Sequence, residues 1–199
     1  MTTTLQNIDS IAPLADGNNT KPADPVRADY DEGRRFLQNG EYPQAAVSLH
    51  NALVGFDERG DEAGIANASN QLGHVCLARK DFKQALEHFQ RAWGICEKLQ
   101  DQMSMIALQK KLIEVFRGQN NYPKAIETCL NLLDSYHHNN DPRGTVEILE
   151  EMALIYLDSG NNEKAADAYR TVASIHRNFR HHNIAESYEK KAEDIEQAA

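Results

Sequence analysis

Three cysteines are the most reactive side chains in this sequence. Cys76, Cys96 and Cys129 lie far apart and lack the CxxC spacing of redox and zinc sites. Helical periodicity places each of them on a predicted helix face. We therefore interpret all three as reduced thiols packed between helices, and we assign them no redox or metal role.

Two histidine pairs are the next candidates for chemistry: His137 with His138, and His181 with His182. Adjacent side chains on a helix point about 100° apart, so one pair cannot readily chelate an ion. A site shared by two stacked pairs is the alternative, but we expect surface histidines, no metal and no cofactor. The chain also lacks a Ser-His-Asp nucleophile motif, a phosphate loop and an HExxH sequence. The sequence therefore predicts no enzyme.

Charge and hydropathy exclude further classes of function. Lys and Arg total 21 against 30 acidic residues, a net charge of -9 that would repel a phosphate backbone, so we expect no nucleic-acid partner. The N-terminus has no basic segment before an apolar run, and no stretch approaches about 20 apolar residues. We predict a cytoplasmic protein without membrane insertion.

Residues 1–24 are rich in Thr, Asn, Asp and Pro and predict a flexible leader. Apolar residues nevertheless recur there at every third position: Leu5, Ile8, Ile11 and Leu14. We expect a loose turn or a frayed helix, and the alternative is a tethered peptide that covers a groove of the same chain.

A repeated segment indicates which elements must position any site. "ARKDFKQALEHFQRAW" at 78–93 returns as "QNGEYPQAAVSLHNAL", "GQNNYPKAIETCLNLL" and "DSGNNEKAADAYRTVA". The copies place one alanine column at intervals of 40 residues: Ala45, Ala85, Ala125 and Ala165. A fixed period between about 20 and 50 residues is typical of stacked repeats.

Each copy resolves into two helices of about 16 to 18 residues joined by a turn. Side-chain acceptors precede the second helices at Glu41, Asp81, Asn121 and Asn161, and the first helices of the following units at Asp61, Asp101 and Asp141. Each first helix is expected to end at a residue in the left-handed backbone conformation, and these residues are Gly40, Lys80, Asn120 and Gly160. A larger side chain in the alanine column would separate the two helices of a unit.

These residues resemble a tetratricopeptide repeat (TPR) array over about 26–199. The second unit carries the family's pattern at Leu72, Gly73, Ala85, Phe89 and Ala92. The 40-residue step is similar to the subgroup of Pins-type polarity adaptors, kinesin light chains and bacterial Rap-type regulators. The resemblance implies an all-α superhelix, or solenoid, of about four helix-turn-helix repeats plus a C-terminal capping helix.

The expected boundaries follow from the period. The leader spans 1–24 and the array 25–199, with repeats at approximately 25–60, 61–100, 101–140 and 141–180 and the cap helix at 183–197. The usual proline at the end of a unit is absent, which agrees with lengthened helices.

The resemblance further implies a concave groove lined by the first helix of each unit, where family members bind their partners. The predicted lining is Arg34, Leu37, Asn67, Asn70, His74, Leu77, Lys110, Glu114, Arg117, Glu147, Glu150 and Leu157, with Tyr30, Gln71 and Lys111 beside them. Asparagine side chains can donate and accept hydrogen bonds, which suits the backbone of an extended peptide. The alternative is that these side chains form an ordinary solvated helix face.

We therefore expect a noncatalytic adaptor or scaffold that binds a peptide or helix of another protein. One alternative is a chaperone-like or peptide-responsive regulatory protein. The other is a structural module that associates with copies of itself.

Overall fold

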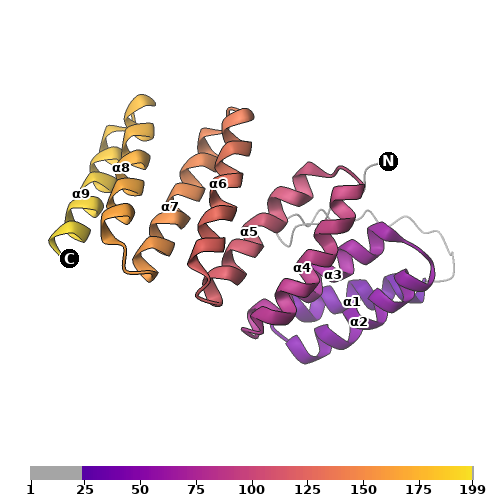
Figure 1. The fold of residues 1–199 in the computed structure, drawn as a ribbon. Coiled ribbons are helices and arrows are strands. Elements are labelled where there is room, and N and C mark those ends of the chain that lie inside the picture. The colour runs from indigo at the N-terminus through magenta and orange to yellow at the C-terminus, as the bar shows by residue number, and fades with distance from the viewer. Residues whose placement is uncertain (1–23, 199) are drawn as a thin grey trace. The chain divides into compact units, whose positions relative to one another are not determined.

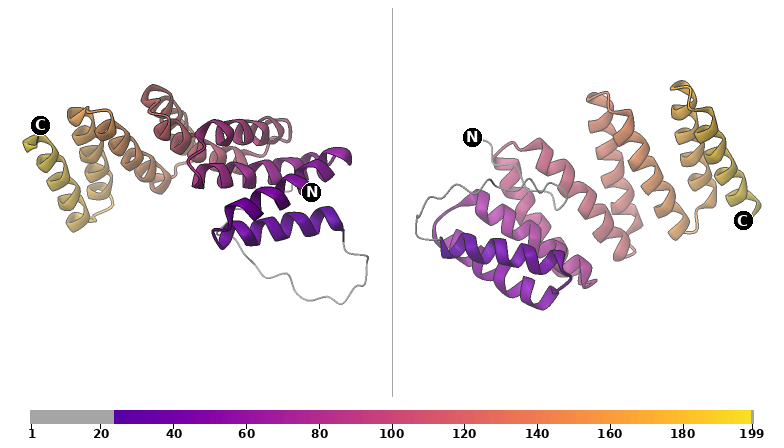
Figure 2. Two further views of the ribbon diagram at one scale, coloured as in Figure 1. Left: turned by 90° about the horizontal axis from the view of Figure 1, so that it is seen from below. Right: turned by 180° about the vertical axis from the view of Figure 1, so that it is seen from behind.

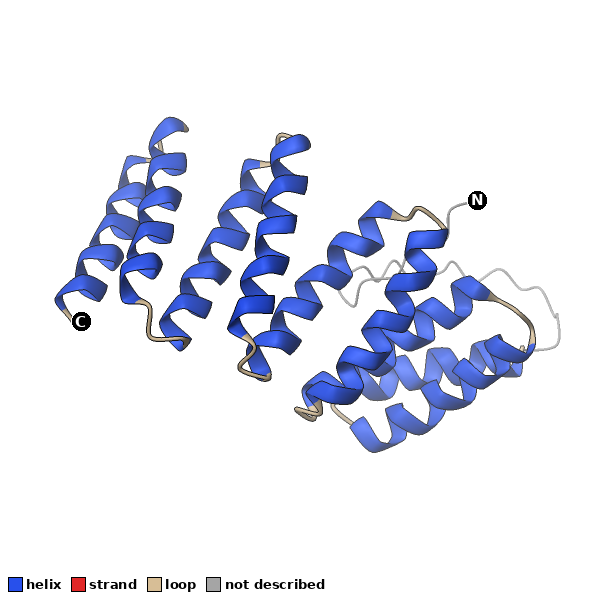
Figure 3. Cartoon of the chain, viewed as in Figure 1, coloured by secondary structure: helices blue, strands red, loops and turns tan. Residues whose placement is uncertain are grey.

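The computed structural model describes residues 24–198, and all regular secondary structure in that range is helical (Figures 1 and 3). The predicted all-α class is confirmed there. The helices are α1 (Pro25–Gln38), α2 (Tyr42–Glu58), α3 (Glu62–Ala78), α4 (Phe82–Lys98), α5 (Gln102–Gly118), α6 (Tyr122–His138), α7 (Pro142–Asp158), α8 (Asn162–Asn178) and α9 (His182–Gln197). The leader lies outside the described residues except for Asp24, whose carboxylate accepts from the Val26 N–H at 3.1 Å.

Helix length is nearly constant along the chain. Each helix from α2 to α8 has 17 residues, within the range that the sequence predicts. Three residues connect each helix to the next, so that consecutive helices begin 20 residues apart from α2 onward. One 40-residue repeat therefore contains two helices of equal length.

Every connection contains one residue in the left-handed region. The predicted stops adopt it, with φ of 77° at Gly40, 59° at Lys80, 55° at Asn120 and 75° at Gly160. The same conformation also ends each second helix, at Gly60, Gln100, Asn140 and Arg180. It lets the next N–H return to the last turn of the helix, as where Glu41 N–H donates to the Phe36 carbonyl at 2.8 Å.

The predicted helix starts are confirmed at six positions, where a side-chain oxygen accepts from the N–H three residues on. These positions are Asp61, Asp81, Asp101, Asn121, Asp141 and Asn161. The prediction for Glu41 is wrong, because its side chain makes no such bond. Its carboxylate, one methylene farther from the backbone than that of aspartate, instead accepts from the Asn39 amide at 3.2 Å.

The chain divides into two compact units, with the boundary between Lys111 and Leu112 inside α5. In the first unit, α1 to α4 pack side by side in sequence order (Figures 1 and 2). Ala45 and Ala85 are fully buried where helices meet. A Cβ on Gly73 would lie 2.5 Å from Phe89 Cε1, so α3 and α4 approach each other through glycine.

In the second unit, α6, α7, α8 and α9 also pack in sequence order (Figure 1). Ala125 and Ala165 continue the alanine column and are fully buried. The contact of α8 with α9 is built from small side chains around Tyr169, against which Tyr188 and Ile195 are partly buried. The Tyr169 and Tyr188 rings stack with their centroids 6.0 Å apart.

Candidate functional site

Helix α3 carries a polar face that is buried within the first unit. Asn67, Asn70, Gln71 and His74 follow helical spacing along one side of the helix, and we call these four residues the amide face. Asn67 and Asn70 are each 8% exposed, and Gln71 is 1% exposed. Such deep burial of amide side chains is costly unless their polar atoms are hydrogen-bonded.

Two polar groups at this face are unpaired among the residues that the structure describes. Gln71 Nε2 and Tyr30 Oη are both buried and have no hydrogen-bond partner there. The Gln71 amide lies near the Tyr30 hydroxyl without reaching hydrogen-bond geometry, and it is the least of the causes that act on the Tyr30 pKa. Burial is the main cause and raises that pKa, while the charges of Arg34 and Arg27 oppose the rise.

Basic side chains border the amide face. The guanidinium carbons of Arg27 and Arg34 lie 5.3 and 5.7 Å from the centroid of the Tyr30 ring, a cation–π distance. Lys111, near the middle of α5, acts electrostatically on His74. We call Arg27, Arg34 and Lys111 the basic border.

His74 is held neutral at ordinary pH. Burial, followed by the charge of Lys111, lowers its pKa from 6.5 to about 4. Its ring meets Phe89 edge to face, with centroids 5.4 Å apart. The imidazole can therefore take part in hydrogen bonding as a neutral group, and it adds no positive charge to the basic border near pH 7.

Two of the predicted groove residues in the second unit, Arg117 and Glu150, bind other side chains of that unit. Arg117 donates to Asp158 at 2.5 Å and to Glu151 at 3.1 Å, and the hydrogen bond to Asp158 is the main cause of its raised pKa. Glu150 accepts a hydrogen bond from the Tyr188 hydroxyl. Glu114 and Glu147 are exposed and also have interaction partners.

The other predicted contacts are only partly exposed. Leu37 and Leu77 lie half-buried on the first and third helices, and Leu157 is half-buried in the second unit. Lys110 is half-buried and has an interaction partner. Within the first unit, the structure brings Asn67, Asn70 and His74 onto one helix face.

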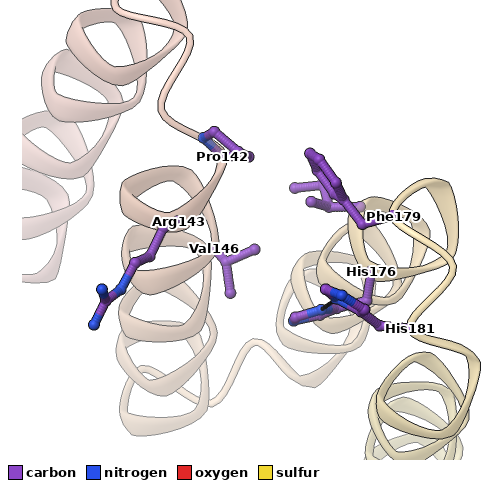
Figure 4. A pocket seen from close by; sticks show the side chains of 7 residues that line it. Pro142, Arg143, Val146, His176, Phe179 and His181 are labelled. Carbon is purple, nitrogen blue, oxygen red and sulfur yellow. Dashed lines mark hydrogen bonds between the residues drawn. The ribbon is translucent and has the colours of Figure 1, made fainter.

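A pocket in the second unit was not predicted. It has a volume of about 290 Å³ and lies where α7 begins and α8 ends. Its lining is Pro142, Arg143, Val146, Ile175, His176, Phe179 and His181 (Figure 4). The available signal was Phe179, a large apolar residue within the polar run "HRNFRHHN".

The cysteines and histidine pairs form no reactive centre in the part of the chain that the structure describes. All three thiols are free and buried, and burial raises the pKa of Cys96 to about 11 and that of Cys129 to about 12. Such thiols are protonated and poor nucleophiles at neutral pH. Within residues 24–198, no three His, Cys, Asp or Glu side chains gather as metal ligands would, and no helix is long and apolar enough to cross a bilayer.

Family models relate this chain to known repeats. Models described as tetratricopeptide repeat match residues 30–97 and 146–179. Tetratricopeptide repeat protein 29 of Macaca fascicularis is 26% identical over 136 residues, which cover 68% of this chain and 29% of that protein. The chain thus spans less than a third of the length of this relative.

Two solved structures share the fold. The nearly identical TPR-like repeats of a Podosopora anserina protein assigned to the kinesin light chains give a TM-score of 0.72 at 16% identity, covering 88% of this chain and 90% of that one. The apo form of RapI gives a TM-score of 0.66 at 15% identity, covering 87% and 70%. At these identities the likeness concerns the fold alone.

Proposed function

The chain belongs to the tetratricopeptide repeat family, and from this premise we propose that it is a noncatalytic adaptor that binds an extended segment of a partner protein along α3. The repeat fold of this family generally mediates protein–protein interaction. The partner contacts in the first unit are the amide face and the basic border.

One observation carries this proposal: Gln71 places an amide N–H donor in the interior, where it makes no hydrogen bond of ordinary geometry to a described residue although the Tyr30 hydroxyl lies nearby. An unpaired buried donor costs about 1–3 kcal/mol, so a sequence selected for stability alone would favour an apolar residue there. Because Gln71 Nε2 is itself buried, a peptide carbonyl would supply the missing acceptor once neighbouring side chains have moved aside. The free energy that the unpaired donor costs the free chain is then regained when the peptide binds, and it adds to the affinity.

The chemistry of the surrounding residues narrows the partner. Asn67 and Asn70 can each donate to a carbonyl and accept from an N–H, which is what an extended backbone offers at successive positions. Arg27 pairs with Asp31 at 3.6 Å, and Arg34 and Lys111 also have interaction partners, but all three cations keep part of their surface exposed and favour a segment that carries carboxylates. We therefore infer an acidic, extended peptide segment.

The predicted contacts in the second unit remain part of the proposal as a separate surface. Glu147 and Glu150 would favour basic groups, and Leu157 an apolar one. Because Arg117 is paired with two acids of its own unit, it is a weaker candidate for a partner carboxylate than the sequence alone suggests.

The test compares partner capture by the full chain and by the double variant Asn67→Ala/Asn70→Ala. Loss of two amide contacts should reduce capture about tenfold or more, at about 1 kcal/mol for each hydrogen bond. Asn131→Ala, which removes an exposed amide on α6, is the matched control and should leave capture unchanged.

Circular dichroism and thermal unfolding must show that the double variant is folded. Equal capture by the folded double variant and the unmodified chain would contradict the proposal. Light scattering over a range of concentrations distinguishes it from self-association, because a self-associating module would increase in mass without any partner.

A further inference from the structure

The connection between α8 and α9 differs from the earlier ones at two matched positions. In every connection from α1 to α9, the N–H of the residue before the new helix donates to the carbonyl five residues earlier, as from His181 to His176 at 2.9 Å. In the seven connections before this one, the earlier residue is Phe, Tyr or Cys and the later one is Asp, Asn or Glu. Between α8 and α9 both positions hold histidine.

His181 stands where a capping side chain would otherwise begin a helix. Asn161, at the same position before α8, accepts from the Lys164 N–H at 3.2 Å, whereas the His181 side chain makes no capping hydrogen bond to α9. A helix without such a cap is less stable than one that has it. The start of α9 therefore does not explain this histidine, whose ring contacts His176 instead.

The two imidazole rings lie side by side at the end of α8 (Figure 4). His176 Nδ1 and His181 Nδ1 are 3.4 Å apart, which is longer than an ordinary N–H···O hydrogen bond of about 2.7–3.2 Å. Two Zn–N bonds of about 2.0–2.1 Å at the tetrahedral angle place their nitrogens about 3.3–3.4 Å apart. His181 is exposed and His176 half-buried, so ions can reach the pair from solvent. The two nitrogens thus have the spacing of two ligands of one zinc ion.

Aromatic stacking holds both rings in place. The His176 ring lies on Tyr188 with centroids 5.6 Å apart and planes inclined by 4°. The His181 ring stacks on Phe179 with centroids 6.3 Å apart. Arg180, with φ of 62°, turns the backbone so that His181 meets the last turn of α8. Ligands held in this way lose little freedom when an ion binds.

Bonds to imidazole, and not opposite charge, must supply the affinity for a cation here. Arg177 is paired with Glu189 at 2.9 Å, Arg180 is exposed in the turn, and Lys191 lies over an aromatic ring at 4.6 Å. Within residues 24–198, no third His, Cys, Asp or Glu side chain joins the pair as a ligand. Neutral nitrogen donors favour zinc over Ca²⁺ and Mg²⁺, which prefer oxygen ligands.

We propose that His176 and His181 bind a zinc ion through their Nδ1 atoms. Two protein ligands leave two positions of a tetrahedral ion open, where water binds and where a carboxylate or imidazole of a partner can replace it. The ion joins the last turn of α8 to the residue that begins α9. His176 belongs to neither of the adjacent histidine pairs in the sequence, which is why no metal was expected there.

The test is a titration of the full, untagged chain with zinc chloride, followed by calorimetry and by NMR of the histidine side chains. One zinc ion should bind per chain, and the imidazole resonances of His176 and His181 should shift and saturate. His176→Ala should weaken binding at least about tenfold, since even the loss of a residue that only orients a ligand costs about 10–100-fold. His137→Ala removes another exposed histidine of the second unit and should leave the affinity unchanged.

His181→Asn separates zinc binding from the stability of the fold. Asparagine supplies the cap that precedes α8, so without zinc this variant should unfold about 2–4 °C above the unmodified chain. Because asparagine is a poor zinc ligand, the same variant should bind zinc at least about tenfold more weakly. Zinc should therefore raise the unfolding temperature of the unmodified chain but not that of His181→Asn.

Three results would overturn the proposal. The first is the absence of saturable zinc binding, and the second is equal affinity for zinc in the unmodified chain and in His181→Asn. The third is a set of zinc-dependent shifts confined to other histidines. Asn67→Ala/Asn70→Ala should bind zinc normally, because this site does not depend on the amide face of α3.

Discussion

Replacement of Gln71 by methionine tests most directly whether the amide face holds an unpaired donor that serves binding. The Gln71 side chain is 1% exposed, and its Nε2 has no partner among the described residues. Methionine has a similar length and is unbranched, so it fits the same space while removing the unpaired donor. Since such a donor costs about 1–3 kcal/mol, we expect Gln71→Met to raise the free energy of unfolding by about 1–2 kcal/mol. This corresponds to about 2–8 °C in Tm.

The assay is urea unfolding followed by circular dichroism, with the midpoint compared at constant slope. Gln90→Met, on the exposed side of α4, is the matched control and should change stability by less than about 0.5 kcal/mol. Partner capture by Gln71→Met should fall while its stability rises. A loss of more than about 1 kcal/mol in Gln71→Met would show that the amide is hydrogen-bonded in the free chain, and Gln71 would then offer no unpaired donor to a partner.

Two further predictions concern the helix contact and the histidine of the first unit. Gly73→Ala should lower the free energy of unfolding by about 1–3 kcal/mol, because the added Cβ would meet the Phe89 ring. Gly94→Ala on α4 should raise the free energy of unfolding by about 1 kcal/mol, because a Cβ at Gly94 has no neighbour within 4 Å and alanine favours the helix. Urea midpoints that move in the same direction would contradict this contrast. Burial lowers the pKa of His74 from 6.5 to about 4, so between these values the unfolded chain takes up a proton that the folded chain does not. The free energy of unfolding should therefore fall as pH drops from about 6.5 to 4, and the fall should be about 1–3 kcal/mol larger in the unmodified chain than in His74→Gln. Parallel pH profiles of the two proteins would exclude the effect.

Local chemistry made most of the fold predictable. Asp81 and Asn161 could be identified as helix starts because a short acceptor side chain acts on the backbone within the next few residues. The stop at Lys80 could be predicted only because Gly40 and Gly160 occupy the same place in other copies. The left-handed residues that end the second helices were missed, because Gly60, Gln100, Asn140 and Arg180 share no residue type.

The candidate sites were less predictable, because helical periodicity identifies a face but not its depth. The sequence placed Asn67 and Asn70 on a lining surface, yet their 8% exposure depends on how closely neighbouring elements approach α3. The pairing of Arg117 with Asp158 joins residues 41 positions apart and has no local signal. The pocket around Phe179 likewise depends on where the start of α7 lies beside the end of α8.

The constant spacing of the helices has a consequence for inserted segments. Within each unit, every connection reverses the chain direction, so even-numbered and odd-numbered helices of that unit run in opposite senses (Figure 1). An insertion of two helices and their connections preserves this parity and leaves every later helix with its own neighbours. An insertion of one helix also keeps the 20-residue step between helix starts. It would nevertheless invert the direction of the helices that follow, and the alanine column would then face a different neighbouring helix. Chimaeras of this chain should therefore tolerate 40-residue insertions at a connection far better than 20-residue ones.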